Sequence, residues 1–119
     1  MNIFFDVVQT IESLDKARVM AEEDRKLAQK DLEKTFANYL FCVFNGLAPV
    51  AMIYAEAIKK HNEGIRVFLD FQVETFEKCS NLLKNLVVRK ASDEEFTEGL
   101  KEVEGYMKEL EKRAQEYLE

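Results

Sequence analysis

The feature that most constrains this chain is a run of 21 residues, Thr35 to Ala55, without a single charged side chain. Charged residues make up 34% of the whole sequence, so the run stands apart from everything around it. Its large apolar side chains recur at positions that would cover a helix on every side. A helix that is apolar all round is buried all round. The run must therefore pack against another part of the chain, another molecule or a membrane.

The composition favours helices. The 119 residues fit one domain, 1–119. They include only 4 Gly and 1 Pro, which is typical of long helices and not of many-turned β folds. We predict an all-α fold, an antiparallel bundle of two long helices and one shorter C-terminal helix with coiled-coil-like packing. The predicted helices span residues 6–44, 49–90 and 93–118.

Local signals place these boundaries. Asp6 and Gln9 have the spacing of a capping box, so the first helix is expected to begin at Asp6. Asn45-Gly46 predicts its end, because glycine readily takes the left-handed conformation that terminates a helix. Pro49 suits the first turn of the second helix.

The second helix has one weak point, His61-Asn62-Glu63-Gly64. The helix either breaks there and restarts at Ile65, or continues at a cost of about 1 kcal/mol for the glycine. We favour a continuous helix, because the apolar periodicity survives across Gly64.

A capping box, Ser92-x-x-Glu95, predicts the start of the third helix. Its apolar residues alternate in steps of four and three, the pattern of a coiled-coil seam. The seam comprises Phe96, Leu100, Val103, Met107, Leu110, Ala114 and Tyr117. This helix should run back along the second helix only to about residue 65. It would leave residues 34–62 of the hairpin uncovered.

The uncovered end is the predicted interface. Four explanations for its burial stay open: self-association into a two-fold dimer, cover from within the chain, membrane insertion, or a different partner protein. Cover could come from Ile3-Phe4-Phe5 folding back or from a break at Gly64. The run is long enough to span a membrane, but the turn falls in its middle. The predicted interface residues are Phe36, Tyr39, Leu40, Phe41, Val43, Phe44, Leu47, Val50, Ile53 and Tyr54.

Two arginines, Arg18 and Arg25, lie on the apolar stripe of the first helix. Folding the hairpin about residues 46–47 places them near carboxylates of the second helix. We predict cross-helix ion pairs Arg25–Asp70 and Arg18–Glu77, which would fix the register of the hairpin. The alternative is that both side chains extend to water.

Catalytic and metal-binding patterns are missing from the sequence. It has one histidine, His61, expected at the surface, with no Glu-x-x-His pair and no Cys/His spacing of a zinc site. No glycine-rich phosphate loop occurs. Cys42 and Cys79 are expected to be buried, reduced thiols. We therefore predict no catalytic residue, no cofactor and no metal.

The distribution of charge along the sequence indicates which classes of binding partner are disfavoured. Residues 91–119 carry 10 acidic and 4 basic groups, which equals the whole net charge of −6. An acidic surface disfavours nucleic acid and anionic lipid. The N-terminus lacks the basic and long apolar regions of a secretory signal, so a cytoplasmic location is expected.

We therefore expect a non-enzymatic interaction module. It would be a homodimer through the hairpin end 36–54 and would act on another protein as an adaptor, assembly factor or regulator. The alternatives are a membrane-associated helical hairpin and a small-molecule-binding bundle. Asn38, Asn45 and Tyr54 are the residues that could line a polar cavity in such a bundle.

Overall fold

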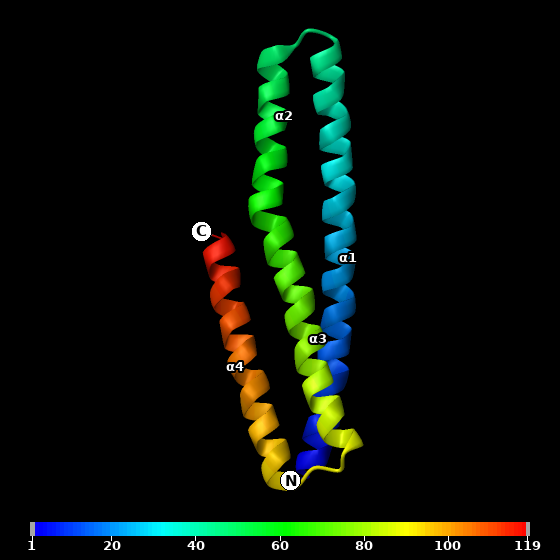
Figure 1. Cartoon of the computed structure of the whole chain (residues 1–119), viewed down its shortest axis with the longest axis vertical. Helices are drawn as coiled ribbons and strands as arrows, with labels where there is room; N and C mark the ends of the chain where they lie inside the picture. Colours follow the sequence, from blue (N-terminus) through cyan, green and yellow to red (C-terminus); the bar gives the residue numbers. More distant parts are fainter. Residues whose placement is uncertain (1, 119) are drawn as a thin grey trace.

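A computed structural model describes residues 2–118, with the backbone alone for Leu118. The described residues form helices and no strand, which confirms the all-α prediction. A long helix α1 packs antiparallel against a second helical arm, and α4 turns back along the lower half of that arm (Figure 1). The molecule is a rod of 67 × 23 × 19 Å. The elements are α1 (Ile3–Phe44), α2 (Ala48–Lys60), a π-helical turn η1 (His61–Ile65), α3 (Arg66–Val88) and α4 (Asp93–Leu118).

Helix α1 begins three residues before the predicted Asp6, so that boundary is wrong. The side chain of Asn2 caps the helix by accepting a hydrogen bond from the Phe4 N–H at 3.0 Å. Asp6 lies inside the first turn. The buried residues of α1 recur at multiples of seven, which is the coiled-coil repeat expected for close side-by-side packing. They are Val7, Leu14, Ala21, Ala28 and Cys42.

The turn between α1 and α2 lies at Asn45-Gly46, as predicted. Gly46 has φ +72°, and its N–H donates to the Val43 carbonyl. The Leu47 N–H donates to the Cys42 carbonyl at 2.9 Å. These two bonds form a Schellman motif, which satisfies the last carbonyls of α1. Pro49 lies in the first turn of α2, as expected.

The weak point at 61–64 does not break the helix. The chain passes through it as a π-helical turn, in which the Arg66 N–H donates to the carbonyl of His61, five residues earlier. A π turn absorbs one extra residue without changing which face points to the neighbour. Tyr54 and His61 lie seven residues apart, whereas eight separate His61 from the buried Leu69. The prediction of a continuous second arm is confirmed.

Helix α4 starts with the predicted capping box. The Glu95 N–H donates to Ser92 Oγ at 3.2 Å, and the Ser92 N–H donates to Glu95 Oε1 at 3.3 Å. The buried residues of α4 include Phe96, Val103 and Leu110 of the predicted seam. They join the core around Val7, Cys79 and Leu83. This core lies at the end of the rod where α1 and α4 begin.

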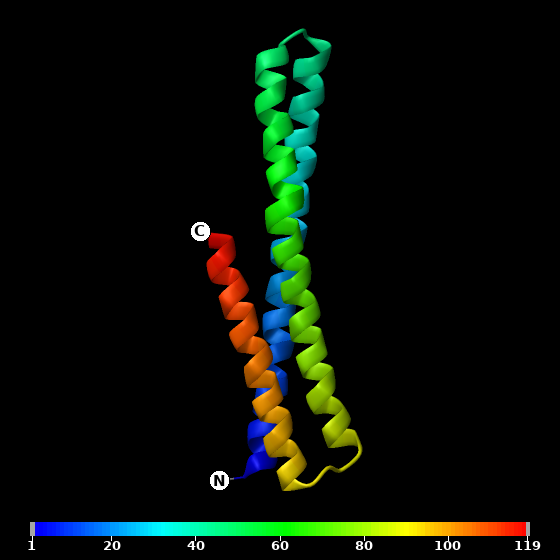
Figure 2. The same ribbon diagram turned by 60° about the vertical axis from the view of Figure 1, so that its left-hand side comes forward.

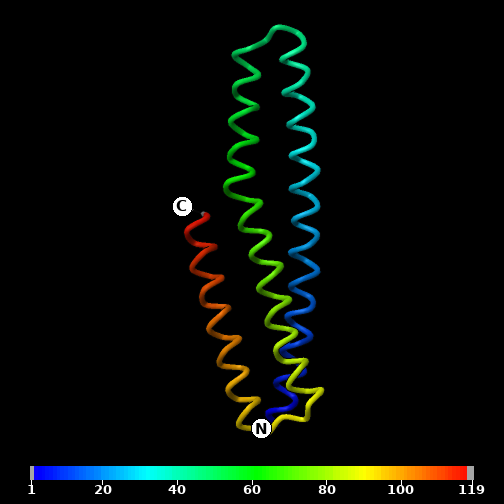
Figure 3. Tube along the Cα trace, viewed as in Figure 1, coloured from blue at the N-terminus to red at the C-terminus, as the bar shows by residue number. Residues whose placement is uncertain are grey.

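The reach of α4 decides what stays uncovered. Its Tyr117 ring stacks on Phe68, with centroids 5.0 Å apart, and lies beside Gly64. In the described part of the chain, α1 and α2 continue beyond this level to the turn without α4 beside them (Figures 2 and 3). The hairpin therefore projects past the three-helix part of the molecule.

Candidate functional site

The projecting end of the hairpin, residues 36–54, is the candidate site, and we call it the tip. Phe44 is 81% exposed and Phe41 is 63% exposed, although both are large and apolar. Of the other predicted interface residues, Tyr39, Leu40 and Tyr54 are half-buried. The exposed large apolar residues of the tip are Phe36, Phe41, Val43, Phe44, Leu47, Val50, Met52 and Ile53.

Small residues explain why the large ones point outward. The buried positions of the tip are Cys42 on α1 and Ala51 on α2. Small side chains at a helix contact let the two backbones approach closely, and they leave no room for Phe or Leu between the helices. The larger side chains of both arms therefore cover the outer surfaces.

Neither source of cover within the chain operates. Ile3, Phe4 and Phe5 form the first turn of α1, at the opposite end of the rod, where the Phe4 ring packs edge-on against Phe96. The alternative that these residues fold back over the tip is therefore wrong. A break at Gly64 is also wrong, because the arm continues through the π turn. Among residues 2–118, no helix combines the length and apolar character needed to cross a membrane.

One of the two predicted ion pairs is present. Arg25 Nη1 lies 3.4 Å from Asp70 Oδ1, and both side chains are 45% exposed. The predicted Arg18–Glu77 pair is wrong, because Arg18 bonds Glu22 of its own helix at 2.8 Å. A partner four residues along the same helix needs no correct hairpin register to be within reach.

A different polar contact ties the arms at this level. Asp15 accepts a hydrogen bond from the buried Ser80 hydroxyl at 2.7 Å and lies 3.1 Å from Lys84 Nζ. The Ser80 hydrogen bond is the main cause that lowers the pKa of Asp15, and Lys84 acts in the same direction. Serine and aspartate at these positions give no signal in the sequence until the register of the hairpin is known.

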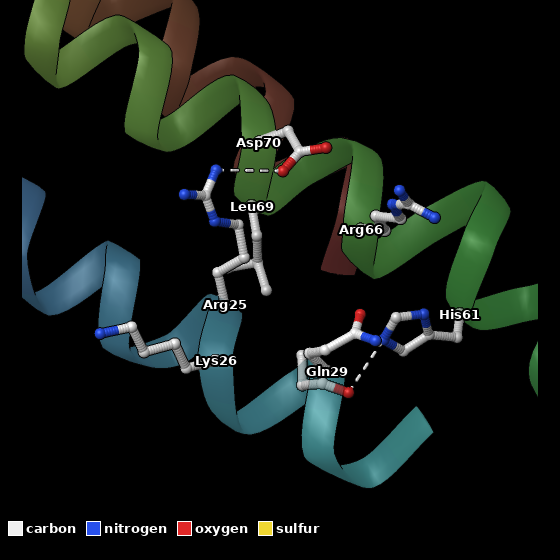
Figure 4. Close-up of a pocket in the computed structure, with 8 residues that line it drawn as sticks. Arg25, Lys26, Gln29, His61, Arg66, Leu69 and Asp70 are labelled. Carbon is white, nitrogen blue, oxygen red and sulfur yellow. Dashed lines mark hydrogen bonds and ion pairs between the residues drawn. The ribbon is translucent and has the colours of Figure 1, made fainter. Parts of the chain in front are cut away.

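The π turn borders an open groove of about 330 Å³. His61 is half-buried there, not at the surface as expected, and its Nε2 lies 3.1 Å from the Ala28 carbonyl. Arg25 is already engaged by Asp70, while Lys26 and Arg66 lie at opposite ends of the groove (Figure 4). These three basic side chains do not point toward a common position, so the groove does not form an anion-binding site.

The cysteines and the asparagines of the tip show no arrangement typical of a reactive or ligand-binding site. Cys42 and Cys79 are buried free thiols, as expected. Burial raises the pKa of the Cys79 thiol, which lowers the fraction of reactive thiolate. Asn45 uses its side-chain amide to donate to the Phe41 carbonyl of its own helix at 2.8 Å, and Asn38 is exposed. In residues 2–118, no three potential His, Cys, Asp or Glu ligands gather into a metal site.

Comparison with known proteins finds no family model, no curated protein and no solved structure that matches this chain. Its function has to be inferred from its own surface, of which the tip is the most unusual part.

Proposed function

We propose that this chain is a non-enzymatic helical interaction module that forms a homodimer through the tip. The charged outer surfaces, above all the acidic α4, would engage another protein, with the module serving as an adaptor, assembly factor or regulator. The observation that carries this proposal is the set of eight exposed large apolar residues within a segment free of charge. The two free thiols fit a reducing compartment such as the cytoplasm.

The exposed apolar area of the tip, summed over all its sides, is as large as one stable interface needs. The exposed fractions of the eight side chains amount to on the order of 900 Å² per copy, taking about 150–250 Å² for a fully exposed large side chain. A standard stable interface buries about 800 Å² on each partner. A second copy supplies an apolar surface of the same size, and closed two-fold dimers are the commonest oligomers. The tip has no charge that would select an oppositely charged partner.

The proposal is tested by light scattering during size-exclusion chromatography. The wild-type chain is expected at twice the 13.9 kDa mass of one copy. Phe41→Lys places a charge in the proposed interface and is expected to give a monomer. Met20→Lys is the matched control, because Met20 also lies on α1, is 68% exposed and lies far from the tip. The proposal fails if wild-type chain is monomeric, or if both variants behave alike.

A membrane-associated hairpin is the second candidate, because the apolar residues surround the tip on more than one side. Phe36 and Val43 are seven residues apart and share one side of α1, whereas Phe44 points well away from them. One flat contact would leave part of this surface in water. Sedimentation with phosphatidylcholine vesicles separates the two functions. Wild-type chain that pellets with vesicles, while Phe41→Lys stays in solution, favours the membrane function.

A further inference from the structure

We propose that two copies join by overlapping their tips in antiparallel orientation, which yields an elongated dimer with four helices at its centre and three helices at each end. This arrangement rests on the proposed function, and it adds where and in which direction the second copy binds. Three features of the chain support it independently: the length of the uncharged segment, the reach of α4 and the position of the net charge.

The ends of the uncharged segment set the depth of the overlap. Lys34 on α1 and Glu56 on α2 are the first charged residues below the tip. Residues 36–44 form the α1 arm of the tip and residues 48–54 form its α2 arm, and the longer arm corresponds to roughly 14 Å of helix at 1.5 Å per residue. An overlap of this depth places apolar surface against apolar surface along its whole length. A deeper overlap would press Phe44 and Leu47 of one copy against charged residues of the other, without a gain in apolar contact.

The reach of α4 leaves room for the second copy. Tyr117 is the last residue of α4 whose side chain the structure describes, and it lies against Phe68 and Gly64 of the second arm. Within residues 2–118, α4 packs along α3, and the hairpin continues past the end of α4 toward the turn (Figure 2). A partner tip can therefore lie alongside this one without displacing α4.

The net charge favours the antiparallel direction. Residues 91–119 carry 10 acidic and 4 basic groups, equal to the whole net charge of −6, and α4 lies at the other end of the rod from the turn. Antiparallel overlap puts the two acidic helices at opposite ends of the dimer, many Debye lengths apart. A parallel dimer would place both acidic halves at the same end, where like charges oppose association.

Small-angle X-ray scattering of the dimer peak tests the arrangement. One copy is 67 Å long. Two copies that overlap by about 14 Å should show a maximum dimension of roughly 120 Å. Parallel copies, or antiparallel copies overlapped along their full length, should stay near 70 Å.

The outcomes separate the two proposals. A dimer mass with a maximum dimension near 120 Å supports the antiparallel tips. A dimer mass with a dimension near 70 Å overturns this arrangement and leaves self-association standing. A monomer mass overturns both. Met20→Lys should retain the dimension near 120 Å, while Phe41→Lys should shorten the particle to the length of one copy; if Phe41→Lys instead keeps the long particle, the contact lies elsewhere.

Discussion

Two glycines of α4, Gly99 and Gly105, allow the packing of this helix on α3 to be measured directly. A methyl group built on Gly99 would lie 2.5 Å from Leu86 Cδ1 and 3.5 Å from methyl carbons of Leu82 and Leu83. The same group on Gly105 would meet no atom within 4 Å. The two sites share a helix and a substitution, and they differ in what the added methyl group meets.

The magnitudes follow from this difference. Replacing glycine by alanine inside a helix stabilises it by about 1 kcal/mol. Gly105→Ala should therefore raise the free energy of unfolding by about that amount. At Gly99 the same gain is opposed by overpacking, which costs about 1–3 kcal/mol when neighbours must shift. Gly99→Ala should lower the free energy of unfolding by about 1 kcal/mol, so that the two variants differ by about 2 kcal/mol.

Urea unfolding followed by circular dichroism measures both values. All proteins are compared at one concentration, because the stability of a self-associating chain depends on it. The urea slope should be unchanged, so that the midpoint reports stability. If Gly99→Ala stabilised the chain as much as Gly105→Ala does, Leu86 would not be held against α4 at this position and the reasoning would be refuted.

Three further substitutions test a left-handed backbone position, a buried hydrogen bond and an exposed ion pair. Lys90 has a left-handed φ of 54°, so replacing it by glycine should stabilise the chain by about 0.5–1 kcal/mol, measured by urea unfolding. The pKa of Asp15 is lowered in the folded state, so its contribution is present above its ordinary value of 3.8 and is lost as pH falls through the folded pKa. Ser80→Ala should therefore cost about 1–2 kcal/mol at pH 7 and less at pH 2, and an equal cost at both would contradict this. Arg25→Gln should cost less than about 0.5 kcal/mol, because its pair with Asp70 is long and exposed; a loss above 1 kcal/mol would be inconsistent with this.

Features that depend on a few neighbouring residues were predictable. The turn at Gly46 and the capping box at Ser92 are each determined by local backbone geometry, which the residue types reveal directly. The uncovered tip was also predictable, since it follows from the lengths of three helices and the uncharged run. Asn2 was missed because the acidic residue at position 6 offered a competing start.

Features that depend on register were not predictable. Helical spacing places Gly105 on the outer face of α4, but the close approach of Leu86 to Gly99 becomes known only from the packed structure. The hydrogen bond between Ser80 and Asp15 joins residues 65 positions apart, and a shift of one residue would separate them. The π turn was not predictable for the same reason. Its extra residue can be recognised only when the residues before and after it are known to pack against α1.

That extra residue leads to a test by deletion. Removing one residue from a regular helix rotates everything after it by about 100° relative to its neighbours. Deleting the exposed Asn62 should instead convert the π turn into regular α-helix. His61 and Leu69 are now eight positions apart, and the deletion would shorten this separation to the seven positions of a regular helical repeat. Deleting Glu77, which is exposed within regular α3, should rotate the fully buried Leu83 out of the core. We expect the first deletion to keep full helicity and cooperative thermal unfolding by circular dichroism, and the second to lose cooperative unfolding. Equal damage from both deletions would mean that the π turn does not hold a removable residue, and that the contact between His61 and Ala28 depends on it.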